Sequence, residues 1–416
     1  MNRKKVQKHH YLKLGISAVL IGIAASLLAF SLKFITEYFQ EHIFEWAIQN
    51  NRFYFILLPT IGITAIYFLR KHLFKKRRNK GITEIYKTLY QRKDHLPLFK
   101  IPSHYLNGFL TVIFGGSTGI EVSTVVATAT IGNYAYKKRT SANSYKLELI
   151  CAGITAGVAI LFASPIGGLL FSLEVIARKV NKSLLIACGA SALVAWGLLF
   201  WMGSKPLIDL GVSDWKWSAL PFFMLLSLCS GALSTYFTKL VVHIKNYFSG
   251  INNNFIRVNS GALLVGGMLC FAPYLYGDSY HGVSEVLINP QGFSILFLLL
   301  LALLKPLAAA LTLGAGGDGG VFAPSIVAGA FLGVAFALLC NALLGTSLIY
   351  INFALVGAAA TLSASIYAPF TALFLICNMV PNGFSLFFPI LLGAWIAKLF
   401  AKKLLPYNVY TYKMDA

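Results

Sequence analysis

A single carboxylate interrupts a run of small and apolar residues in the first third of the sequence. Glu121 lies in GGSTGIEVSTVVATATIG, residues 115–132, where the other side chains are small, apolar or hydroxyl-bearing. An ionisable side chain within an apolar, membrane-length segment is costly and indicates a function. Because this segment holds no Lys or Arg, an ion pair made only for packing is the weaker interpretation. We therefore predict that Glu121 acts on a transported ion or a proton.

The glycines beside Glu121 also predict a break in a helix. Segment 107–136 has basic residues before and after it, so both of its ends are expected on the same side of a membrane. The chain must then reverse inside the membrane, and we place the reversal in GGSTGIEV, residues 115–122. Segment 147–177 repeats the pattern, with a break at Ala163-Ser164-Pro165. Irregular backbone at that depth must face protein or a water-filled cavity.

The composition is that of a membrane protein. Of the 416 residues, 57% are hydrophobic and 12% are charged, and the mean hydropathy is +0.71, well above that of a soluble domain. We expect a polytopic all-α membrane protein, whose first apolar stretch is retained rather than cleaved as a signal peptide. Apolar stretches long enough to cross about 30 Å of hydrocarbon as helices lie at 15–34, 53–69, 183–203, 218–238 and 260–276.

The net charge of +21 follows the topology rather than a nucleic-acid site. Acidic residues instead mark the connecting segments 35–50 and 277–290. This asymmetry predicts that both termini, including a segment over 1–14, lie in the cytoplasm, and a bacterial inner membrane is the expected location. The basic residues form short clusters between apolar stretches, at 3–5, 70–80, 137–139, 178–182 and 402–403.

The second half of the sequence resembles the first. A shift of 201 positions places GGSTGIEVS (115–123) on the first nine residues of GGDGGVFAPS (316–325), and a shift of 204 places SPIGGLLF (164–171) on APFTALFL (368–375). Two interrupted segments at nearly equal offsets are typical of transporters that are built from repeats and bind their substrate near the middle of the membrane.

These motifs resemble the CLC family of chloride channels and chloride/proton exchangers. GGVFAP at 319–324 is similar to the family's Gly-x-Phe-x-Pro element, and GIEVS at 119–123 to its Gly-Lys/Arg-Glu-Gly-Pro element. NKGITEI at 79–85 stands where the family has Gly-Ser-Gly-Ile-Pro-Glu. Pro406–Tyr410 stands where the last helix, here expected over about 406–414, presents a tyrosine to the pore.

The resemblance covers residues 15–416, with repeat halves at about 55–203 and 218–400. It implies a CLC-type inverted repeat of tilted and broken helices, a homodimer, and no C-terminal CBS domains. It also implies bound chloride ions with no metal or other cofactor, because helix N-termini offer N–H donors and partial positive charge to an anion. The implied anion-binding residues are Lys80, Gly81, Ile82, Ile120, Val122, Val321, Phe322, Ala323 and Tyr410.

By this resemblance Glu121 is a gate that occupies the anion site when ionised and leaves it when protonated. Three departures from the family matter. Lys80 replaces a serine of the anion site, and its flexible stem is expected to reach the cytoplasm. Val122 and Ser123 replace the Gly and Pro that follow the gate. Glu174 matches a structural acid, and Val175 stands where most exchangers carry the inner proton-passing glutamate, as in many channels of the family.

The leading interpretation is chloride conduction gated by protonation of Glu121, and the alternative is chloride/proton exchange at the same site. Fluoride selectivity, found in one branch of the family, is less well matched by these motifs. We do not expect an enzyme. Gly189-Ala190-Ser191-Ala192 is similar to the serine motif of rhomboid proteases, but His243 and His281 follow at segment ends or in loops, where neither is placed to activate that serine.

Overall fold

The structure is a computed structural model. It describes residues 3–74, 79–91, 94–138, 145–203, 206–212 and 214–412. Over these residues the regular elements are all helical, and eight helical segments are long and apolar enough to cross a membrane. The expected polytopic all-α fold is therefore confirmed.

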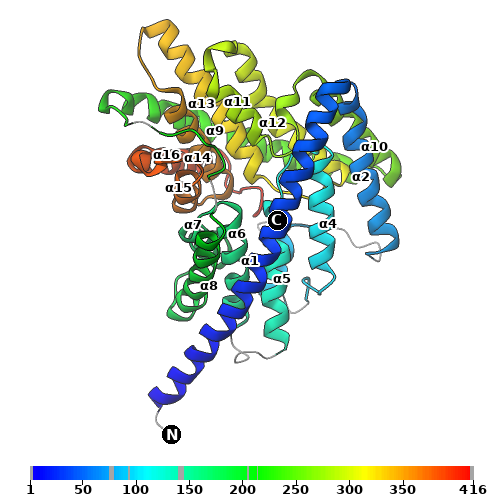
Figure 1. Ribbon diagram of the computed structural model, residues 1–416, viewed down its shortest axis with the longest axis vertical. Coiled ribbons are helices and arrows are strands. Elements are labelled where there is room, and N and C mark those ends of the chain that lie inside the picture. Colours follow the sequence, from blue (N-terminus) through cyan, green and yellow to red (C-terminus); the bar gives the residue numbers. More distant parts are fainter. Residues whose placement is uncertain are drawn as a thin grey trace.

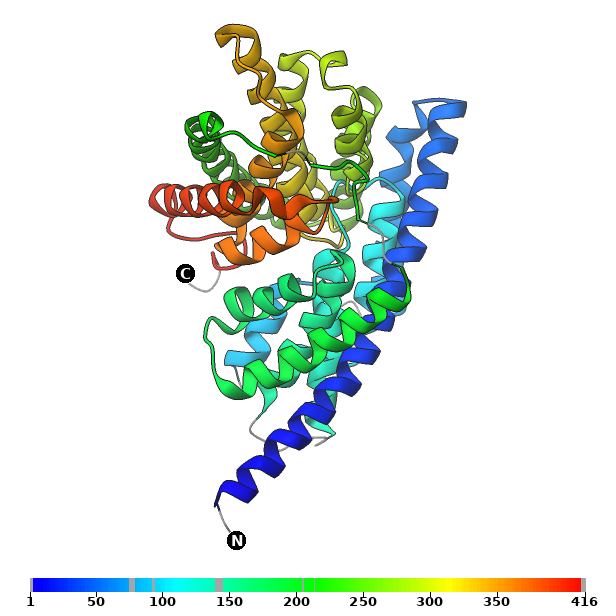
Figure 2. The same cartoon turned by 60° about the vertical axis from the view of Figure 1, so that its left-hand side comes forward.

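The first half holds eight α-helices. The longest, α1, runs along one side of the molecule (Figures 1 and 2). The helices are α1 (Arg3–Asn50), α2 (Tyr54–His72), α3 (Ile82–Tyr90), α4 (Lys100–Ile113), α5 (Glu121–Lys137), α6 (Lys146–Leu161), α7 (Pro165–Phe171), which continues into a π-helical turn (Ser172–Ala177), and α8 (Lys182–Trp201).

The second half repeats this order. Its helices are α9 (Leu220–Ser249), α10 (Asn254–Phe271), α11 (Tyr280–Ile288), α12 (Ile295–Ala315), α13 (Phe322–Leu344), α14 (Tyr350–Ile366), α15 (Pro369–Cys377) and α16 (Phe387–Leu404). The predicted offsets hold at the level of whole helices. The starts of α5 and α13 differ by 201 positions, and those of α6 and α14, like those of α7 and α15, by 204.

The two halves are inverted relative to each other. The counterparts α2 and α10 pack closely and run antiparallel, because Ile56 near the start of α2 contacts Gly266 late in α10, whereas Arg70 at the end of α2 shares a pocket with Asn254 at the start of α10. Adding a Cβ to Gly266 would bring it 2.3 Å from the carbonyl oxygen of Ile56. This close approach explains the glycine.

The expected reversal inside segment 107–136 is present. Helices α4 and α5 pack against each other, and residues 114–120 form the non-helical turn between them. Gly115 has a φ of +81°, and a Cβ there would lie 2.7 Å from the ring of Tyr276. The break at Ala163-Ser164-Pro165 is also present, since Ser164 caps α7 by accepting a hydrogen bond from the N–H of Gly167. The first turn is mostly buried in protein, and in the second Ser164 is buried while Ala163 and Pro165 are half-buried, which agrees with their depth.

Two sequence-based expectations about element boundaries are wrong. Residues 35–50 do not connect helices but continue α1 to Asn50. Its charged side chains lie on one face of that helix, where they line a cavity. The expected helix over 406–414 is absent from the described part of that range, because α16 ends at Leu404 and residues 406–412 form turns. Asn408 stabilises these turns by accepting hydrogen bonds from the backbone N–H groups of Tyr410 and Thr411.

Candidate functional site

The N-termini of α5 and α13 meet in the interior. A Cβ on Gly320 would lie 2.2 Å from Cγ2 of Val122, and one on Gly319 would lie 2.3 Å from Oγ1 of Thr118. Gly319 also has a φ of +158°. Only glycine allows the two turns to come this close. Residues 119–123 and 320–324, which are about two hundred positions apart in the sequence, are therefore direct neighbours.

A third helix N-terminus joins them. Gly81 precedes α3 with a φ of +61°, and a Cβ there would lie 3.2 Å from Cγ1 of Val122. These three N-termini border a cavity of about 300 Å³, which we call the basic cavity. Six of the predicted anion-binding residues line it, namely Lys80, Gly81, Ile82, Val122, Val321 and Tyr410. The unpaired N–H groups of the first helical turns favour an anion in such a place.

Tyr410 contributes a hydroxyl to the basic cavity. Its side chain is buried, and its hydroxyl oxygen has no hydrogen-bond partner among the described residues. A buried hydroxyl without a partner is costly unless a ligand or water satisfies it. The turn around Asn408 therefore positions the tyrosine that a helix was expected to present.

The lining of the basic cavity carries more positive than negative charge. It includes five cationic side chains and one carboxylate, Asp318. Such a field raises the local concentration of anions. Lys80 is exposed at this cavity, which agrees with the expectation that its stem reaches towards water rather than to the centre of the site. The cationic residues are Arg70, Lys80, Lys87, Lys245 and Arg257.

Glu121 is the first residue of α5 and does not line the basic cavity. Its side chain is only 4% exposed. Its carboxylate folds back against Gly119, where a Cβ would lie 2.1 Å from Oε2 of Glu121. The hydroxyl of Tyr280 donates a hydrogen bond to Oε1 at 3.2 Å, whereas Oε2 has no partner among the described residues.

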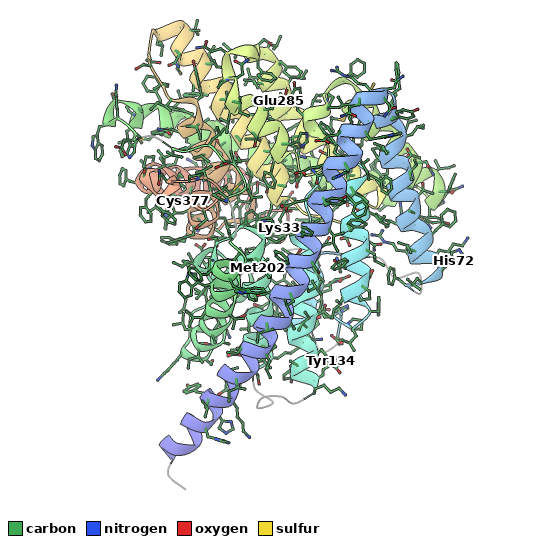
Figure 3. The ribbon with its side chains drawn as sticks, viewed as in Figure 1. Lys33, His72, Tyr134, Met202, Glu285 and Cys377 are labelled. Atoms are coloured by element: carbon green, nitrogen blue, oxygen red, sulfur yellow. The ribbon has the colours of Figure 1, made fainter. Side chains whose placement is uncertain are left out.

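Tyr280 lines a second cavity, of about 700 Å³, which we call the acidic cavity. Five carboxylates and one lysine line it, three of the carboxylates coming from the second half of α1. Three of its lining residues, Lys33, Met202 and Glu285, come from α1, the end of α8 and α11 (Figure 3). The carboxylates are Glu37, Glu41, Glu45, Asp278 and Glu285.

Glu121 therefore lies between two cavities of opposite charge. Val122 lines the basic cavity, and Tyr280, which binds the Glu121 carboxylate, lines the acidic one. A rotation of one side chain can move the carboxylate between a tyrosine hydroxyl on one side and helix N-termini on the other.

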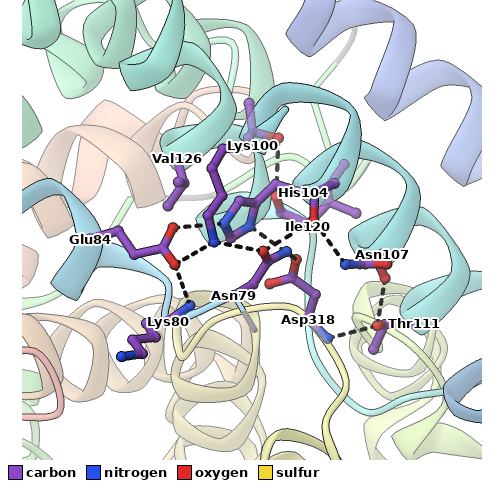
Figure 4. A network of polar contacts seen from close by, with 12 residues as sticks. Asn79, Lys80, Glu84, Lys100, His104, Asn107, Thr111, Ile120, Val126 and Asp318 are labelled. Atoms are coloured by element: carbon purple, nitrogen blue, oxygen red, sulfur yellow. Dashed lines mark hydrogen bonds and ion pairs between the residues drawn. The ribbon is translucent and has the colours of Figure 1, made fainter. Parts of the chain in front are cut away.

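A buried polar network holds the loops of the basic cavity in place (Figure 4). Lys100 donates to Glu84 at 2.6 Å, and the backbone N–H of Lys80 donates to the same carboxylate at 2.9 Å. His104 Nδ1 lies 3.0 Å from Asp318, which also accepts a hydrogen bond from Asn79. The network joins the turn before α3 to the turn before α13 through α4.

Asp318 does not cap α13, because that helix begins after Val321 with no side-chain cap hydrogen bond, and the Asp318 carboxylate binds His104 and Asn79.

Lys305 is a buried cation that sequence reasoning missed. It lies in the middle of α12 and is fully buried. Its ammonium group donates to Oγ of Ser117 at 2.9 Å, Oγ of Ser279 at 2.8 Å and the carbonyl oxygen of Gly277 at 2.8 Å. It thus ties the turn before α5, which leads to Glu121, to the turn before Tyr280. A lone lysine in the apolar segment 295–315 was the available signal.

Val175, which the resemblance places at the inner acid position of exchangers, lies within the π-helical turn after α7. Its carbonyl oxygen accepts a hydrogen bond from the Tyr86 hydroxyl at 2.7 Å. The neighbouring Glu174 accepts hydrogen bonds from the N–H and hydroxyl of Thr371, at 2.7 and 2.6 Å, at the start of α15. Glu174 therefore has the structural contacts expected of it.

Three of the predicted anion-binding residues do not line the basic cavity. Phe322 and Ala323 are buried at the start of α13, and Ile120 is half-buried before α5. The ring of Phe322 packs 6.5 Å from that of Tyr410, centroid to centroid. Ile120 stands directly before α5, and Phe322 and Ala323 are the first two residues of α13, so all three belong to the helix starts that border the cavity. Ser191, weighed as a nucleophile, donates its hydroxyl to the carbonyl oxygen of Ala152.

Comparison with known proteins agrees with the motifs. The sequence model described as voltage gated chloride channel matches residues 61–402. The H(+)/Cl(-) exchange transporter ClcA of Yersinia pestis is 26% identical over 404 residues, covering 93% of this chain and 84% of that protein. The same transporter of Cronobacter sakazakii is 25% identical over 418 residues, covering 97% and 88%.

Solved structures show the same fold. A CLC-type fluoride/proton antiporter superposes with a TM-score of 0.81 at 23% identity, covering 99% of this chain and 98% of that one. A slow cyanobacterial Cl-/H+ antiporter gives 0.80 at 21% identity, with 97% of each chain covered. Together with the match over residues 61–402 and the inverted repeat around Glu121, these results show that the chain belongs to the voltage gated chloride channel family, the CLC family.

Proposed function

We propose that this protein moves chloride across a cell membrane in exchange for protons. The observation that carries the proposal is the position of Glu121, a buried carboxylate between the acidic cavity and the three helix N-termini of the basic cavity. The curated relatives of similar length are H(+)/Cl(-) exchange transporters, which supports exchange over the channel activity that Val175 had favoured.

In this mechanism chloride and the ionised Glu121 carboxylate compete for one binding site. Chloride enters the basic cavity, attracted by its cations, and binds to the N–H groups at the starts of α3, α5 and α13 and to the Tyr410 hydroxyl. An ionised Glu121 carboxylate competes for the same donors when it leaves the Tyr280 hydroxyl. Once protonated, the carboxyl loses its attraction to them and rotates to the Tyr280 side, so the anion and the proton exchange places.

The acidic cavity supplies protons to this cycle and the basic cavity supplies anions. Fixed negative charge at a mouth raises the local proton concentration and lowers that of anions, and fixed positive charge does the reverse. We assign the basic cavity to the cytoplasmic side, because its cations continue the basic run 70–80. Because residue 175 is a valine, protons reach the cytoplasm from Glu121 through water in the basic cavity.

Passive chloride conduction is the second candidate. It is favoured by Val175, which removes a proton-carrying group from the inner route. In either case we propose an inner-membrane homodimer with both termini in the cytoplasm, supported by the positive clusters and by the family's organisation.

Flux in reconstituted vesicles tests the proposal. In vesicles that contain the purified protein and start with equal pH on both sides, an outward chloride gradient should drive protons inward. A protonophore should then abolish the resulting pH gradient. Chloride flux without any proton movement would leave passive conduction as the function. Repeating the assay with fluoride in place of chloride shows which halide is preferred.

A further inference from the structure

Two threonines, one repeat offset apart, lie behind the turns that border the anion site. Thr111 is near the end of α4 and Thr312 near the end of α12, and their positions differ by 201, as do the starts of α5 and α13. Their side chains are 1% and 0% exposed. Neither residue lines the basic cavity or the acidic cavity. Any effect of these residues on the anion site must therefore pass through the turns that they contact.

Each threonine binds the turn of the opposite half through its hydroxyl oxygen. Thr111 Oγ1 accepts a hydrogen bond from the backbone N–H of Asp318 at 2.9 Å (Figure 4). Thr312 Oγ1 accepts one from the backbone N–H of Ser117 at 3.1 Å. Ser117 and Asp318 are again 201 positions apart, in the turns before α5 and α13. We call these two reciprocal bonds the threonine clasp.

The hydroxyl protons of the threonine clasp are donated within each helix. Thr111 Oγ1 donates to the carbonyl oxygen of Asn107 at 2.7 Å, four residues earlier in α4. Thr312 Oγ1 donates to the carbonyl oxygen of Ala308 at 2.8 Å, four residues earlier in α12. A hydroxyl has one proton to donate and two lone pairs with which to accept. Because its proton is held by its own helix, each hydroxyl faces the opposite turn as an acceptor.

Glycines in both turns let the two threonine methyl groups approach. A Cβ on Gly116 would lie 2.5 Å from Cγ2 of Thr111 and 3.1 Å from Cγ2 of Thr312. A Cβ on Gly317, the repeat counterpart of Gly116, would lie 2.7 Å from Cγ2 of Thr312 and 3.1 Å from Cγ2 of Thr111. Both methyl groups therefore pack against both turns, so the threonine clasp joins the two turns to each other as well as to α4 and α12.

We propose that Thr111 and Thr312 are positioning residues of the anion site, each acting on the turn of the opposite half. Thr312 holds the turn that leads into α5 at Glu121, and Thr111 holds the turn that leads into α13. Without the hydroxyl a buried backbone N–H has no partner, and moving the turn towards water relieves that cost. The N–H groups that bind chloride then lose their alignment. This inference rests on the proposed function, because it concerns the same anion site.

Calorimetric titration of the full-length protein in detergent micelles with chloride tests the threonine clasp. Thr111→Val and Thr312→Val remove the hydroxyl but nearly keep the size of the side chain, whereas Thr111→Ser and Thr312→Ser keep the hydroxyl. Thr130→Val is the matched control. Thr130 is buried in α5 and donates to the carbonyl oxygen of Val126, four residues earlier, at 2.7 Å, but accepts no bond from the other half among the described residues. The melting temperature of each variant is measured alongside.

Each valine variant should raise the dissociation constant for chloride about tenfold, the effect of one buried N–H left without its partner. Each serine variant should bind chloride like the wild type, because its hydroxyl restores the acceptor. Thr130→Val should also bind like the wild type, whatever its melting temperature. If a valine variant does not fold, Thr111→Cys or Thr312→Cys, with a weaker acceptor, should show a smaller loss in the same direction.

Two results would overturn the threonine clasp and leave the proposed function intact. One is a valine or cysteine variant that binds chloride as tightly as the wild type does. The other is a loss of affinity that the serine variant shares, since the hydroxyl would then not be its cause. Absence of chloride binding in the wild type would instead overturn the proposed function, and this inference with it.

Discussion

Tyr280 is the residue that fixes the carboxylate of Glu121 on the side of the acidic cavity. Its hydroxyl is the one donor that the described residues offer to Glu121 Oε1. Without it, an ionised carboxylate has no polar partner on that side and returns to the helix N-termini, where it competes with chloride. In the proposed mechanism Tyr280 would therefore act on transport by positioning Glu121.

Replacing Tyr280 with Phe should therefore lower chloride flux at neutral pH by roughly tenfold, the effect of losing a hydrogen bond to a charged group. The loss should shrink at acidic pH, where Glu121 is protonated. Chloride efflux from vesicles at both pH values measures this. Tyr274→Phe is the control, since the Tyr274 hydroxyl binds the exposed Glu285. Equal flux in Tyr280→Phe and wild type at neutral pH would show that Tyr280 does not position the gate.

Tyr410 is expected to affect affinity rather than gating. Tyr410→Phe removes the partnerless hydroxyl from the basic cavity, so the dissociation constant for chloride should rise about three- to tenfold, which corresponds to one net hydrogen bond. Calorimetric titration of the purified protein with chloride measures it. Tyr407→Phe, outside the cavity lining, should bind like the wild type. An unchanged affinity in Tyr410→Phe would remove this residue from the site.

At the scale of elements, we expect chloride binding to depend on how closely the starts of α5 and α13 approach. Gly319→Ala places a Cβ near Thr118 and the carbonyl oxygen of Gly119, in a conformation with a φ of +158°. It should destabilise the protein by about 1–3 kcal/mol and weaken chloride binding, as read by melting temperature and titration. Gly211→Ala, where a Cβ has open space, is the control. Normal chloride binding in Gly319→Ala would show that this contact does not shape the site.

The segment between α3 and α4 is anchored by Asp94, outside the membrane-spanning helices. Its carboxylate accepts hydrogen bonds from the N–H of Leu96, from Asn133 and from Lys137 at the end of α5. Partial burial acts to raise the pKa of Asp94, but the hydrogen bonds and the charge of Lys137 outweigh it and lower the pKa below its ordinary value.

This lowered pKa means that the Asp94 contribution is present at neutral pH and is lost as the pH falls through the folded-state value. Asp94→Asn should therefore lower the free energy of unfolding at about pH 7 by on the order of 1 kcal/mol, and the loss should be smaller near pH 3. Melting curves at the two pH values measure it, with Asp209→Asn as an exposed control. A loss in Asp94→Asn that is the same at both pH values would contradict this sign.

The sequence predicted helices and breaks well where local chemistry decides them. Gly115 and Pro165 mark turns that follow from the backbone preferences of glycine and proline themselves. The repeat offset of 201 positions predicted that Glu121 and Phe322 are counterparts, and both residues begin a helix. The acidic residues at 35–50 suggested a connecting segment. They instead extend α1, and their carboxylates line the acidic cavity. Pro406 and Asn408 favoured turns over the helix expected there.

Contacts that join distant segments could not be predicted in the same way. Tyr280 and Lys305 contact the turn around Glu121 from the other half of the chain. No local sequence pattern predicts contacts between segments so far apart. Lys305 at least carried a signal, as a lone cation in an apolar helix. Tyr280 carried none, because a tyrosine at the start of a short helix is ordinary.

At the scale of the whole molecule, two inverted halves bring helix N-termini together between cavities of opposite charge. The basic cavity carries five cations and the acidic cavity five carboxylates. This polarity suits a protein that takes anions from one side and protons from the other, and the Glu121 carboxylate lies between the two cavities, against Gly119 and the Tyr280 hydroxyl.

The most direct test is a paired measurement of chloride and proton flux from vesicles that contain either the wild type or Glu121→Gln. In the wild type, chloride flux should depend on pH and drive protons. In the variant, chloride flux should persist without pH dependence, and proton movement should fall to that of protein-free vesicles, because Gln cannot be ionised. If Glu121→Gln kept both the pH dependence and the proton movement of the wild type, the role assigned to this carboxylate would be wrong.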